Sequence, residues 1–417
     1  MRQDGIELRK IRLEQAGEEI ADINEKIICE YKKAAFPIRS GMKIAVAVGS
    51  RGISRIDEIV SQVVRCLKAS GAEPFLIPAM GSHGGAEAKG QKMVLEGYGI
   101  TEERMGVPIL SSMKVKSLGV TKEEPHIPVW MDENAFSADG VIAVNRVKAH
   151  TDFHGTHESG IVKMMAIGLG KQAQALEVHR YGAAGLRDYI PEISKEVIRS
   201  GKIIGALAIL EDGYDRTADL AFAGPEEIFE VDKRFLERSK RLMARLPFEQ
   251  IDVLIVDEMG KNISGTGMDT NVIGRLRIGG QQDGAPVCGR VVALHLTEES
   301  HGNALGIGLA DVIPKELSDS VDWKTTYANV ITSGFLERGF LPIVAETEKQ
   351  AVLTALHTCG VPKMETARIV RIRNTMDLNE IYISRALWDE AKEKGNMRPS
   401  GEWKRMEFTN DGRVEAF

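Results

Sequence analysis

The chain has 417 residues, of which 43% are hydrophobic and 27% charged, and its formal net charge is −6. This composition is typical of a globular protein, and the length exceeds what one hydrophobic core usually supports, so we expect two domains. The acidic balance, without a long Lys/Arg block, argues against a nucleic-acid-binding groove.

Apolar runs in the first half of the chain predict buried strands, each followed by helical periodicity. These runs are Met42–Val48, Glu73–Pro78, Gly140–Val144 and Lys202–Leu210. After the first run, apolar residues from Ile56 to Leu67 fall on one face of a helix. The first three runs end in loops that carry polar residues, two of them rich in glycine. This is the doubly wound α/β pattern, in which ligands bind beyond the carboxyl ends of the strands.

The second half of the chain predicts another α/β domain. A charged amphipathic helix is expected over Glu226–Leu246 and ends at Pro247. Further strands are expected at Ile251–Val256, Gly289–Leu296 and Ala367–Ile372, with a helix around Lys349–Cys359. We therefore expect two domains, residues 1–247 and 248–417, each a sheet of alternating strands and helices, with the active site in the cleft between them.

The cysteines and the N-terminal residues bear on the compartment. The cysteines, Cys29, Cys66, Cys288 and Cys359, are far apart in the sequence, which excludes a CxxC zinc ribbon and suits a reducing compartment. The first residues are charged and lack the apolar segment of a signal peptide, and no apolar run is long enough to span a bilayer. We expect a cytoplasmic protein without a membrane partner.

Two glycine-rich loops follow predicted strands at Gly49–Gly52 and Gly81–Gly85. Such loops can aim backbone N–H groups at an anion, and the N-terminus of a following helix adds partial positive charge. The alternative is that these glycines only make tight turns. His83 lies in the second loop, between a strand and a helix, where catalytic groups are commonly held.

Three histidines, His150, His154 and His157, share the stretch HTDFHGTHESGIVK. Their spacing would place them on one face of a helix, where they could bind zinc. The glycines of this stretch and Ser159 are poor helix formers, so we expect the helix to begin near Glu158 or Ser159. A zinc site made by these histidines alone is therefore the weaker interpretation.

Lys163 lies in the otherwise apolar stretch Ile161–Leu169. An ammonium group among such side chains is costly unless it is paired or chemically modified, so this lysine is a candidate for covalent chemistry. The alternative is that its side chain reaches along the surface to water. His179 follows 16 positions later, at the end of a helix expected over Gln172–Val178.

In order and spacing, five of these positions resemble the nickel-dependent lactate racemase family, whose members attach a nickel-pincer nucleotide to a lysine. The matching residues are an arginine after an early strand, two catalytic histidines, the attachment lysine and a nickel-ligating histidine: Arg51, His83, His150, Lys163 and His179. The resemblance covers most of residues 40–185. A looser match lies around Gly265–Arg277.

The resemblance implies that domain 1–247 binds the cofactor and carries the catalytic residues, while domain 248–417 closes over the substrate. His83 and His150 would be the acid/base pair, Lys163 the covalent anchor and His179 the nickel ligand. Further expected cofactor contacts are Ser50, Arg51, Gly81, Ser82 and Gly160, and expected substrate contacts are Arg51, Arg277 and Lys148. The expected partners are a small hydroxy acid and the proteins that synthesise the cofactor; a homo-oligomer is left open.

The sequence departs from the family at three positions. The family's early loop carries an aspartate where this chain has Val48, and its substrate-contacting Gln and Lys fall near Gly274 and Arg277. These changes predict a different substrate pocket. The expected activity is inversion of C2 in a 2-hydroxy acid by reversible hydride transfer, with a larger hydroxy or sugar acid in place of lactate.

Two other functions are left open by the residues themselves. One is a zinc-dependent hydrolase that uses the three clustered histidines with Glu158 as the base. The other is a sugar-acid or nucleotide binder that keeps the fold and catalyses nothing. Stoichiometric zinc without a nucleotide would favour the first, and ligand binding without equilibration of enantiomers would favour the second.

Overall fold

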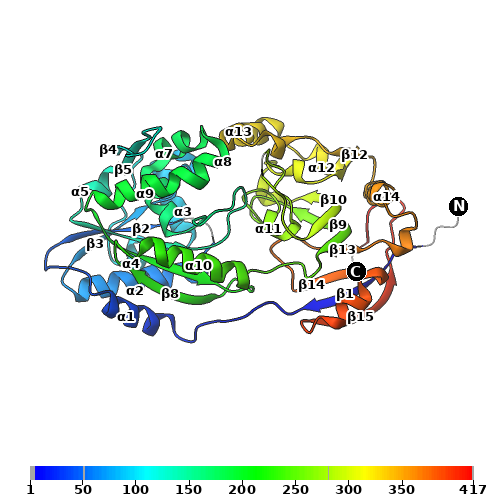
Figure 1. The fold of residues 1–417 in the computed structure, drawn as a ribbon, viewed down its shortest axis with the longest axis horizontal. Coiled ribbons are helices and arrows are strands. Elements are labelled where there is room, and N and C mark those ends of the chain that lie inside the picture. Colours follow the sequence, from blue (N-terminus) through cyan, green and yellow to red (C-terminus); the bar gives the residue numbers. More distant parts are fainter. Residues whose placement is uncertain (1–4, 50–51, 280, 416–417) are drawn as a thin grey trace. The chain divides into compact units, whose positions relative to one another are not determined.

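A computed structural model describes residues 5–49, 52–279 and 281–415 of the chain (Figure 1). Its contacts divide the chain into two compact units. One unit is Ala16–Met243; the other combines the chain up to Gln15 with the chain from Ala244 onward. Each unit contains a sheet that is mainly parallel and is interleaved with helices. The predicted two-domain α/β fold is confirmed.

The first strand, β1 (Glu7–Leu13), does not belong to the unit that the sequence predicts for it. It pairs antiparallel with β14 (Glu380–Ser384) and with β15 (Met397–Arg405), and Figure 1 shows it in blue beside those orange and red strands. Such a pairing joins the two ends of the chain, so no local pattern of apolar residues could reveal it. The unit that corresponds to the predicted domain 1–247 therefore begins at Ala16, after β1.

The unit Ala16–Met243 is built on a five-stranded sheet in the order β3-β2-β6-β7-β8. Its strands are β2 (Lys43–Val48), β3 (Glu73–Pro78), β6 (Gly140–Arg146), β7 (Ile203–Glu211) and β8 (Thr217–Ala223). All neighbours are parallel except β7 and β8. The carboxyl ends of β2, β3, β6 and β7 therefore share one edge of the sheet, as ligand-binding ends do in this class of fold.

Helices cover this sheet because its strands are apolar over nearly their whole length. Ile44, Val46 and Val48 of β2 join one core cluster with the apolar faces of α1 (Ile23–Ala34) and α2 (Ile56–Ala69). Strands buried in this way need not alternate apolar and polar residues, which is why the sequence shows continuous apolar runs. The remaining elements of the unit are α3 (Ala88–Gly97), α4 (Glu102–Met105), β4 (Val115–Val120), β5 (Pro128–Asp132), α5 (Glu133–Ser137), α8 (Gly182–Ala184), α9 (Ile190–Arg199) and α10 (Ile228–Leu242).

A helical run follows β6 and carries two of the predicted site residues. It consists of α6 (Ile161–Lys163), a π-helical segment η2 (Met164–Gly168) and α7 (Leu169–His179). The run begins later than the sequence predicts, because Lys148 and Ser159 still pair with each other as an antiparallel bridge. It is interrupted at Lys171, whose φ of 56° and ψ of −156° are not helical.

The second unit holds an eight-stranded sheet in the order β12-β11-β10-β9-β13-β14-β1-β15. Its parallel strands are β9 (Gln250–Met259), β10 (Val287–Leu296), β11 (Val312–Pro314), β12 (Ile343–Ala345) and β13 (Ile369–Ile372). Its helices are α11 (Thr270–Ile273), α12 (Lys315–Asp319), α13 (Trp323–Ser333), α14 (Glu348–Thr358) and α15 (Trp388–Glu393). Among the residues that the structure describes, no helix combines the length and the apolar character needed to cross a bilayer.

Candidate active site at the carboxyl ends of the strands

The loops that carry the predicted site residues follow β2, β3 and β6 and converge on the segment after Lys163. A Cβ atom on Gly81 would lie 2.9 Å from Cγ2 of Ile167, and one on Gly168 would lie 2.8 Å from the carbonyl oxygen of Ala79. Glycine is therefore required where the loop after β3 meets η2. Two predicted residues of the loop after β2, Ser50 and Arg51, lie outside the described residues.

The loop from Lys148 to Ser159 is closed at its base and organised around a buried carboxylate. The N–H of Lys148 donates to the carbonyl of Ser159 at 2.7 Å. Inside the loop, Glu158 is 1% exposed, and its carboxylate accepts the backbone N–H groups of His150 at 2.7 Å and Gly155 at 3.1 Å. This arrangement satisfies the loop's N–H groups without a helix, which explains why the helix starts only at Ile161.

Glu158 also binds two side chains. Nζ of Lys240, from α10, donates to it at 2.6 Å, and Nδ1 of His154 lies 3.5 Å away. Burial raises the pKa of the Glu158 carboxyl, but the hydrogen bonds from His154, Lys240 and the His150 N–H outweigh burial and hold that pKa below its ordinary value. Glu158 is thus a carboxylate bound to N–H donors that anchors the loop, and it is not placed to act as the base of a zinc hydrolase.

His157 belongs to a second buried anchor. Its Nδ1 lies 3.0 Å from Asp232 of α10, and its ring packs edge-to-face on Phe229. The other oxygen of Asp232 accepts the N–H of Val162 at 3.0 Å. A Cβ atom on Gly160 would come within 2.0 Å of that carboxylate, so on this side Gly160 faces Asp232 and leaves no room for a ligand.

The three clustered histidines therefore have three different environments. His154 is half exposed beside Glu158, His157 is buried on Asp232, and the His150 ring stacks on Phe153 at 4.6 Å. Over the described ranges, no three His, Cys, Asp or Glu side chains are placed to hold one metal ion. His154 and His157 thus hold the loop through carboxylates, and His150 faces a different residue.

His150 is directed at Lys163. Nζ of the lysine lies 2.5 Å from Nε2 of His150, while Nδ1 of the same ring accepts the backbone N–H of Asp152 at 3.0 Å. This contact places the expected attachment lysine directly against an imidazole ring. An imidazole can exchange a proton with a neighbouring amine near neutral pH, and a lysine acts as a nucleophile only in its neutral form.

A buried side chain of α3 holds the loop that carries His83. Nε2 of Gln91, a fully buried side chain of α3, donates to the carbonyl oxygens of Gly81 at 2.8 Å and His83 at 3.2 Å. Gly81 has a φ of +61°, which glycine adopts at little cost. Ser82 and His83 are partly exposed at the shared edge of the sheet.

His179 ends α7, beyond the interruption at Lys171. A straight helix would separate residues 16 positions apart by about 24 Å. The run from Lys163 to His179 is broken at Lys171. The distance of a straight helix therefore does not describe the separation of these two residues.

Other charged residues gather at the end of β6 and β7. Arg146 pairs with Glu211, and the N–H of Ser54 donates to the same carboxylate at 2.6 Å. Asp215 lies nearby: burial and the charge of Glu211 raise its pKa, against the opposing charges of Arg146 and Lys148. The expected substrate contact Lys148 thus lies in a mixed-charge cluster that the sequence did not indicate.

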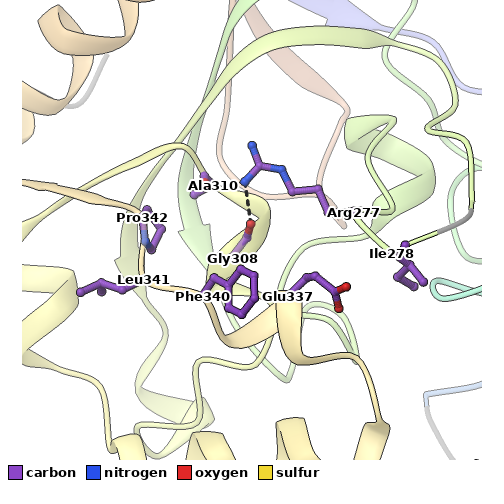
Figure 2. A pocket seen from close by; sticks show the side chains of 9 residues that line it. Arg277, Ile278, Gly308, Ala310, Glu337, Phe340, Leu341 and Pro342 are labelled. Atoms are coloured by element: carbon purple, nitrogen blue, oxygen red, sulfur yellow. Dashed lines mark hydrogen bonds between the residues drawn. The ribbon is translucent and has the colours of Figure 1, made fainter. Parts of the chain in front are cut away.

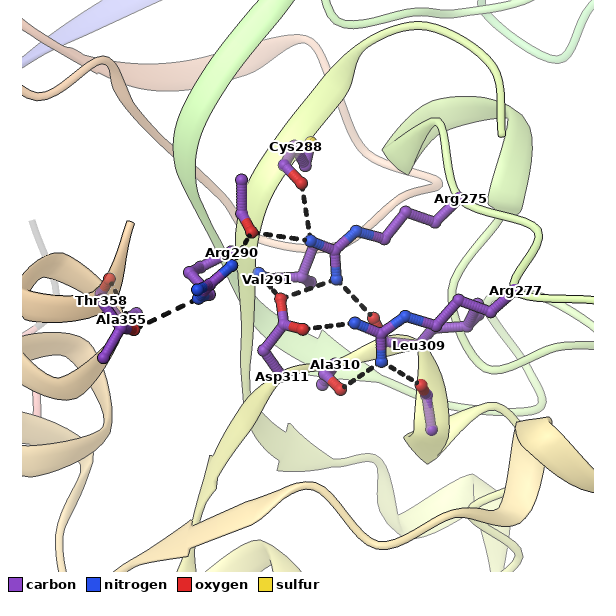
Figure 3. Close-up of polar contacts among 12 residues, drawn as sticks. Arg275, Arg277, Cys288, Arg290, Val291, Leu309, Ala310, Asp311, Ala355 and Thr358 are labelled. Atoms are coloured by element: carbon purple, nitrogen blue, oxygen red, sulfur yellow. Dashed lines mark hydrogen bonds and ion pairs between the residues drawn. The ribbon is translucent and has the colours of Figure 1, made fainter. Parts of the chain in front are cut away.

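Arg277, the expected carboxylate contact in the second unit, is engaged within that unit. Its guanidinium pairs with Asp311 and donates to the carbonyls of Gly308 at 2.8 Å and Ala310 at 3.2 Å (Figure 3). Burial raises the pKa of Asp311, but the charge of Arg275 and further hydrogen bonds hold it below its ordinary value. Arg277 also lines a pocket of about 420 Å³ together with Gly308 and Phe340 (Figure 2).

The backbone at Gly274, near the position where the family resemblance would place a glutamine, leaves no room for a side chain. Its φ is +69°, and a Cβ atom there would lie 1.9 Å from the carbonyl oxygen of Pro286. Any side chain at this position would therefore collide with the chain before β10.

Known sequences and known structures give different results. No family model and no curated protein matches the chain. Among solved structures, the lactate racemase apoprotein from Thermoanaerobacterium thermosaccharolyticum matches with a TM-score of 0.54 over 88% of this chain and 94% of that chain. The chain has the fold of a lactate racemase. The two sequences are 11% identical, so the likeness to the lactate racemase extends to the architecture of both units and not to activity.

Several residues of this site were missed from the sequence. Asp232 and Lys240 are contributed by α10, far along the chain from the loop that they hold. Gln91 and Lys171 are buried beneath the His83 loop. The position of Lys171 shortly after the apolar stretch Ile161–Leu169 is the signal in the sequence that could have indicated it.

Proposed function

We propose that the protein is an isomerase that inverts C2 of a 2-hydroxy acid, using a nickel-pincer nucleotide attached to Lys163. The contact between Lys163 and His150 carries this proposal, because it sets the expected attachment lysine against an imidazole that can exchange a proton with it during acylation. The lactate-racemase fold over most of the chain supports it. So does the order of the strands, because β3, β2 and β6 are neighbours and the segments after β3 and β6 carry His83 and His150.

The described residues fit such a group. Lys163 would hold it covalently, and His179 offers an imidazole, a donor that suits nickel. The glycines of the loop after β3 bring backbone N–H groups to the edge where a phosphate would bind. When bound, the cofactor would accept the C2 hydride and return it to either face.

The histidines would move the hydroxyl proton. Once Lys163 is acylated, its nitrogen no longer exchanges a proton with His150, so Nε2 of that ring can face the substrate oxygen instead. To take the hydroxyl proton at Nε2, the His150 ring would carry its own proton on Nδ1, where the carboxylate of Asp152 lies 3.8 Å away. His150 and His83 would then alternate as acid and base, since the oxygen of each enantiomer lies on a different side. The Glu158 anchor keeps His150 in place by its backbone.

The substrate we propose is a hydroxy acid larger than lactate. Gly274 leaves out the side chain that contacts lactate in the family, and its backbone geometry forbids one. Arg277 is bound to Asp311, so Lys148 is the stronger candidate among the described residues to meet the carboxylate. Sugar acids fit these conditions because their additional hydroxyl groups need space and polar contacts.

The test is racemisation by protein produced in a host that makes the cofactor, with chiral 2-hydroxy acids and aldonic acids as the panel. We expect at least one acid to equilibrate with its C2 epimer, and we expect His83→Asn to abolish turnover while the mass added at Lys163 remains. Protein that carries the adduct but equilibrates no member of the panel would contradict the proposal and favour a binding function.

A further inference from the structure

A fully buried ion pair lies beneath the His83 loop and has no part in the chemistry proposed above. Nζ of Lys171 lies 3.0 Å from Oδ2 of Asp132, and both side chains are 0% exposed. Removing two charges from water costs several kcal/mol, and replacing such pairs with apolar residues is often neutral or stabilising. Stability alone therefore does not explain why this ion pair is present.

The lysine of this pair is also bound to the chain around β3. Its Nζ donates to Oε1 of Gln91 at 3.0 Å and to the carbonyl of Pro78, the last residue of β3. Gln91 in turn donates its amide N–H groups to the carbonyls of Gly81 and His83. The amide of Gln91 thus links Lys171 by hydrogen bonds to the loop that bears His83.

Two glycines allow this contact. A Cβ atom on Gly84 would lie 2.6 Å from the backbone N of Gln91, and one on Gly90 would lie 1.9 Å from the carbonyl oxygen of Gly84. Side chains at either position would lift the loop off α3. The loop is therefore packed directly on the residue that holds its carbonyls.

The conformation of Lys171 is itself strained. A φ of 56° with a ψ of −156° is rarely adopted by residues other than glycine, because the side chain then crowds the backbone. Lys171 thus combines backbone strain with a buried charge. It lies in the helical run that carries Lys163 before it and His179 after it. Such combinations persist where function constrains the structure.

We infer that Lys171, Asp132 and Gln91 are positioning residues that fix His83 relative to the helical run bearing Lys163 and His179. This inference rests on the proposed function in so far as His83 is an acid/base. The contacts of the network are the same whatever His83 does, so the two claims can be tested separately.

The experiment compares Gln91→Met with Gln174→Met. Gln174 is a matched control, because it is also 0% exposed, lies on α7, and binds only the backbone of β5, at Trp130 and Pro128. A second variant, Lys171→Met with Asp132→Asn, removes both charges together so that neither is left unpaired. Amide hydrogen exchange of peptides covering residues 79–87 is measured first, and it needs no activity.

We expect Gln91→Met and the double variant to raise exchange in residues 79–87 by about tenfold or more, and Gln174→Met to leave it within about twofold. In cofactor-loaded protein, kcat should fall by about tenfold or more with KM little changed, because a displaced acid/base costs rate and not binding. The adduct at Lys163 should remain. Gln91→Met that exchanges like Gln174→Met, or that keeps full kcat after its loop has loosened, would overturn the inference. Wild-type protein without racemisation would refute the proposed function, while the exchange comparison would still decide the structural claim.

Discussion

Nζ of Lys163 lies 2.5 Å from Nε2 of His150, and the other nitrogen of that ring accepts the N–H of Asp152. These two contacts hold the ring of His150 between the backbone of Asp152 and the amine of Lys163. A residue expected from the sequence to be an anchor thus lies next to a residue expected to be an acid/base.

Lys163 should be more reactive than its modest exposure suggests. At pH 7 we expect an acylating reagent to modify Lys163 faster than the exposed lysine Lys89, because the imidazole of His150 lies within reach of the proton that the amine loses. His150→Phe should slow this modification by about tenfold, since it removes that imidazole. Labelling rates of the corresponding peptides by mass spectrometry provide the measurement. Equal rates in wild-type and His150→Phe protein would contradict the assignment.

Glu158 should stabilise the unit Ala16–Met243 through the loop that it anchors. Glu158→Gln replaces the charged partner of Lys240, whose side chain is 35% exposed, and puts an amide N–H against the N–H of His150 or Gly155 at a side chain that is 0% exposed. We expect the free energy of unfolding to fall by about 2 kcal/mol, chiefly because a buried N–H group is left without an acceptor. The control is Glu192→Gln, whose side chain is 32% exposed beside Lys195, with an expected change of about 0.5 kcal/mol or less. Similar losses in the two variants would argue against an anchoring role.

The same carboxylate predicts a pH dependence. Its pKa is lowered in the folded chain, so its contribution to stability is fully present above the unfolded pKa of about 4.3 and is lost as the pH falls through the folded pKa. The difference in unfolding free energy between wild type and Glu158→Gln should therefore be constant near neutrality and shrink below about pH 4. Denaturant titrations at several pH values measure it. A difference that grew on acidification would reverse the sign and contradict the assignment.

Much of the α/β architecture could be predicted because buried strands and helices show local patterns of apolar residues. β3 was expected over the residues where it occurs, since a buried parallel strand is a short apolar run between turns. β1 could not be placed, because its partners are at the other end of the chain. The expected cleft between the domains stays a prediction.

The candidate site was predicted in its residue types more than in its arrangement. The sequence left a zinc site at His154 and His157 open as the weaker interpretation, and their partners are the carboxylates of Glu158 and Asp232. Asp232 comes from a helix whose proximity only the tertiary structure reveals. A pattern in one loop cannot show which of its polar residues face other elements.

Gly274 should not tolerate a side chain. We expect Gly274→Ala to lower the free energy of unfolding by about 2 kcal/mol or more, because a φ of +69° and the nearby Pro286 carbonyl both oppose a Cβ atom. Gly279→Ala is the matched control, since a Cβ atom there meets only a flexible Glu337 side chain at 3.8 Å. Thermal and denaturant unfolding give the comparison. Gly274→Ala as stable as Gly279→Ala would show that the position is open to a side chain.

The central claim is that Lys163 carries the cofactor, and the mass of the protein tests it most directly. Wild-type protein and Lys163→Ala are produced side by side in a host that builds the nickel-pincer nucleotide, with a lactate racemase as the positive control. Their intact masses and the peptides covering residue 163 are then measured. The account predicts an added mass on Lys163 in the wild type and none in Lys163→Ala. An unmodified Lys163 peptide, obtained while the lactate racemase control is loaded, would contradict it.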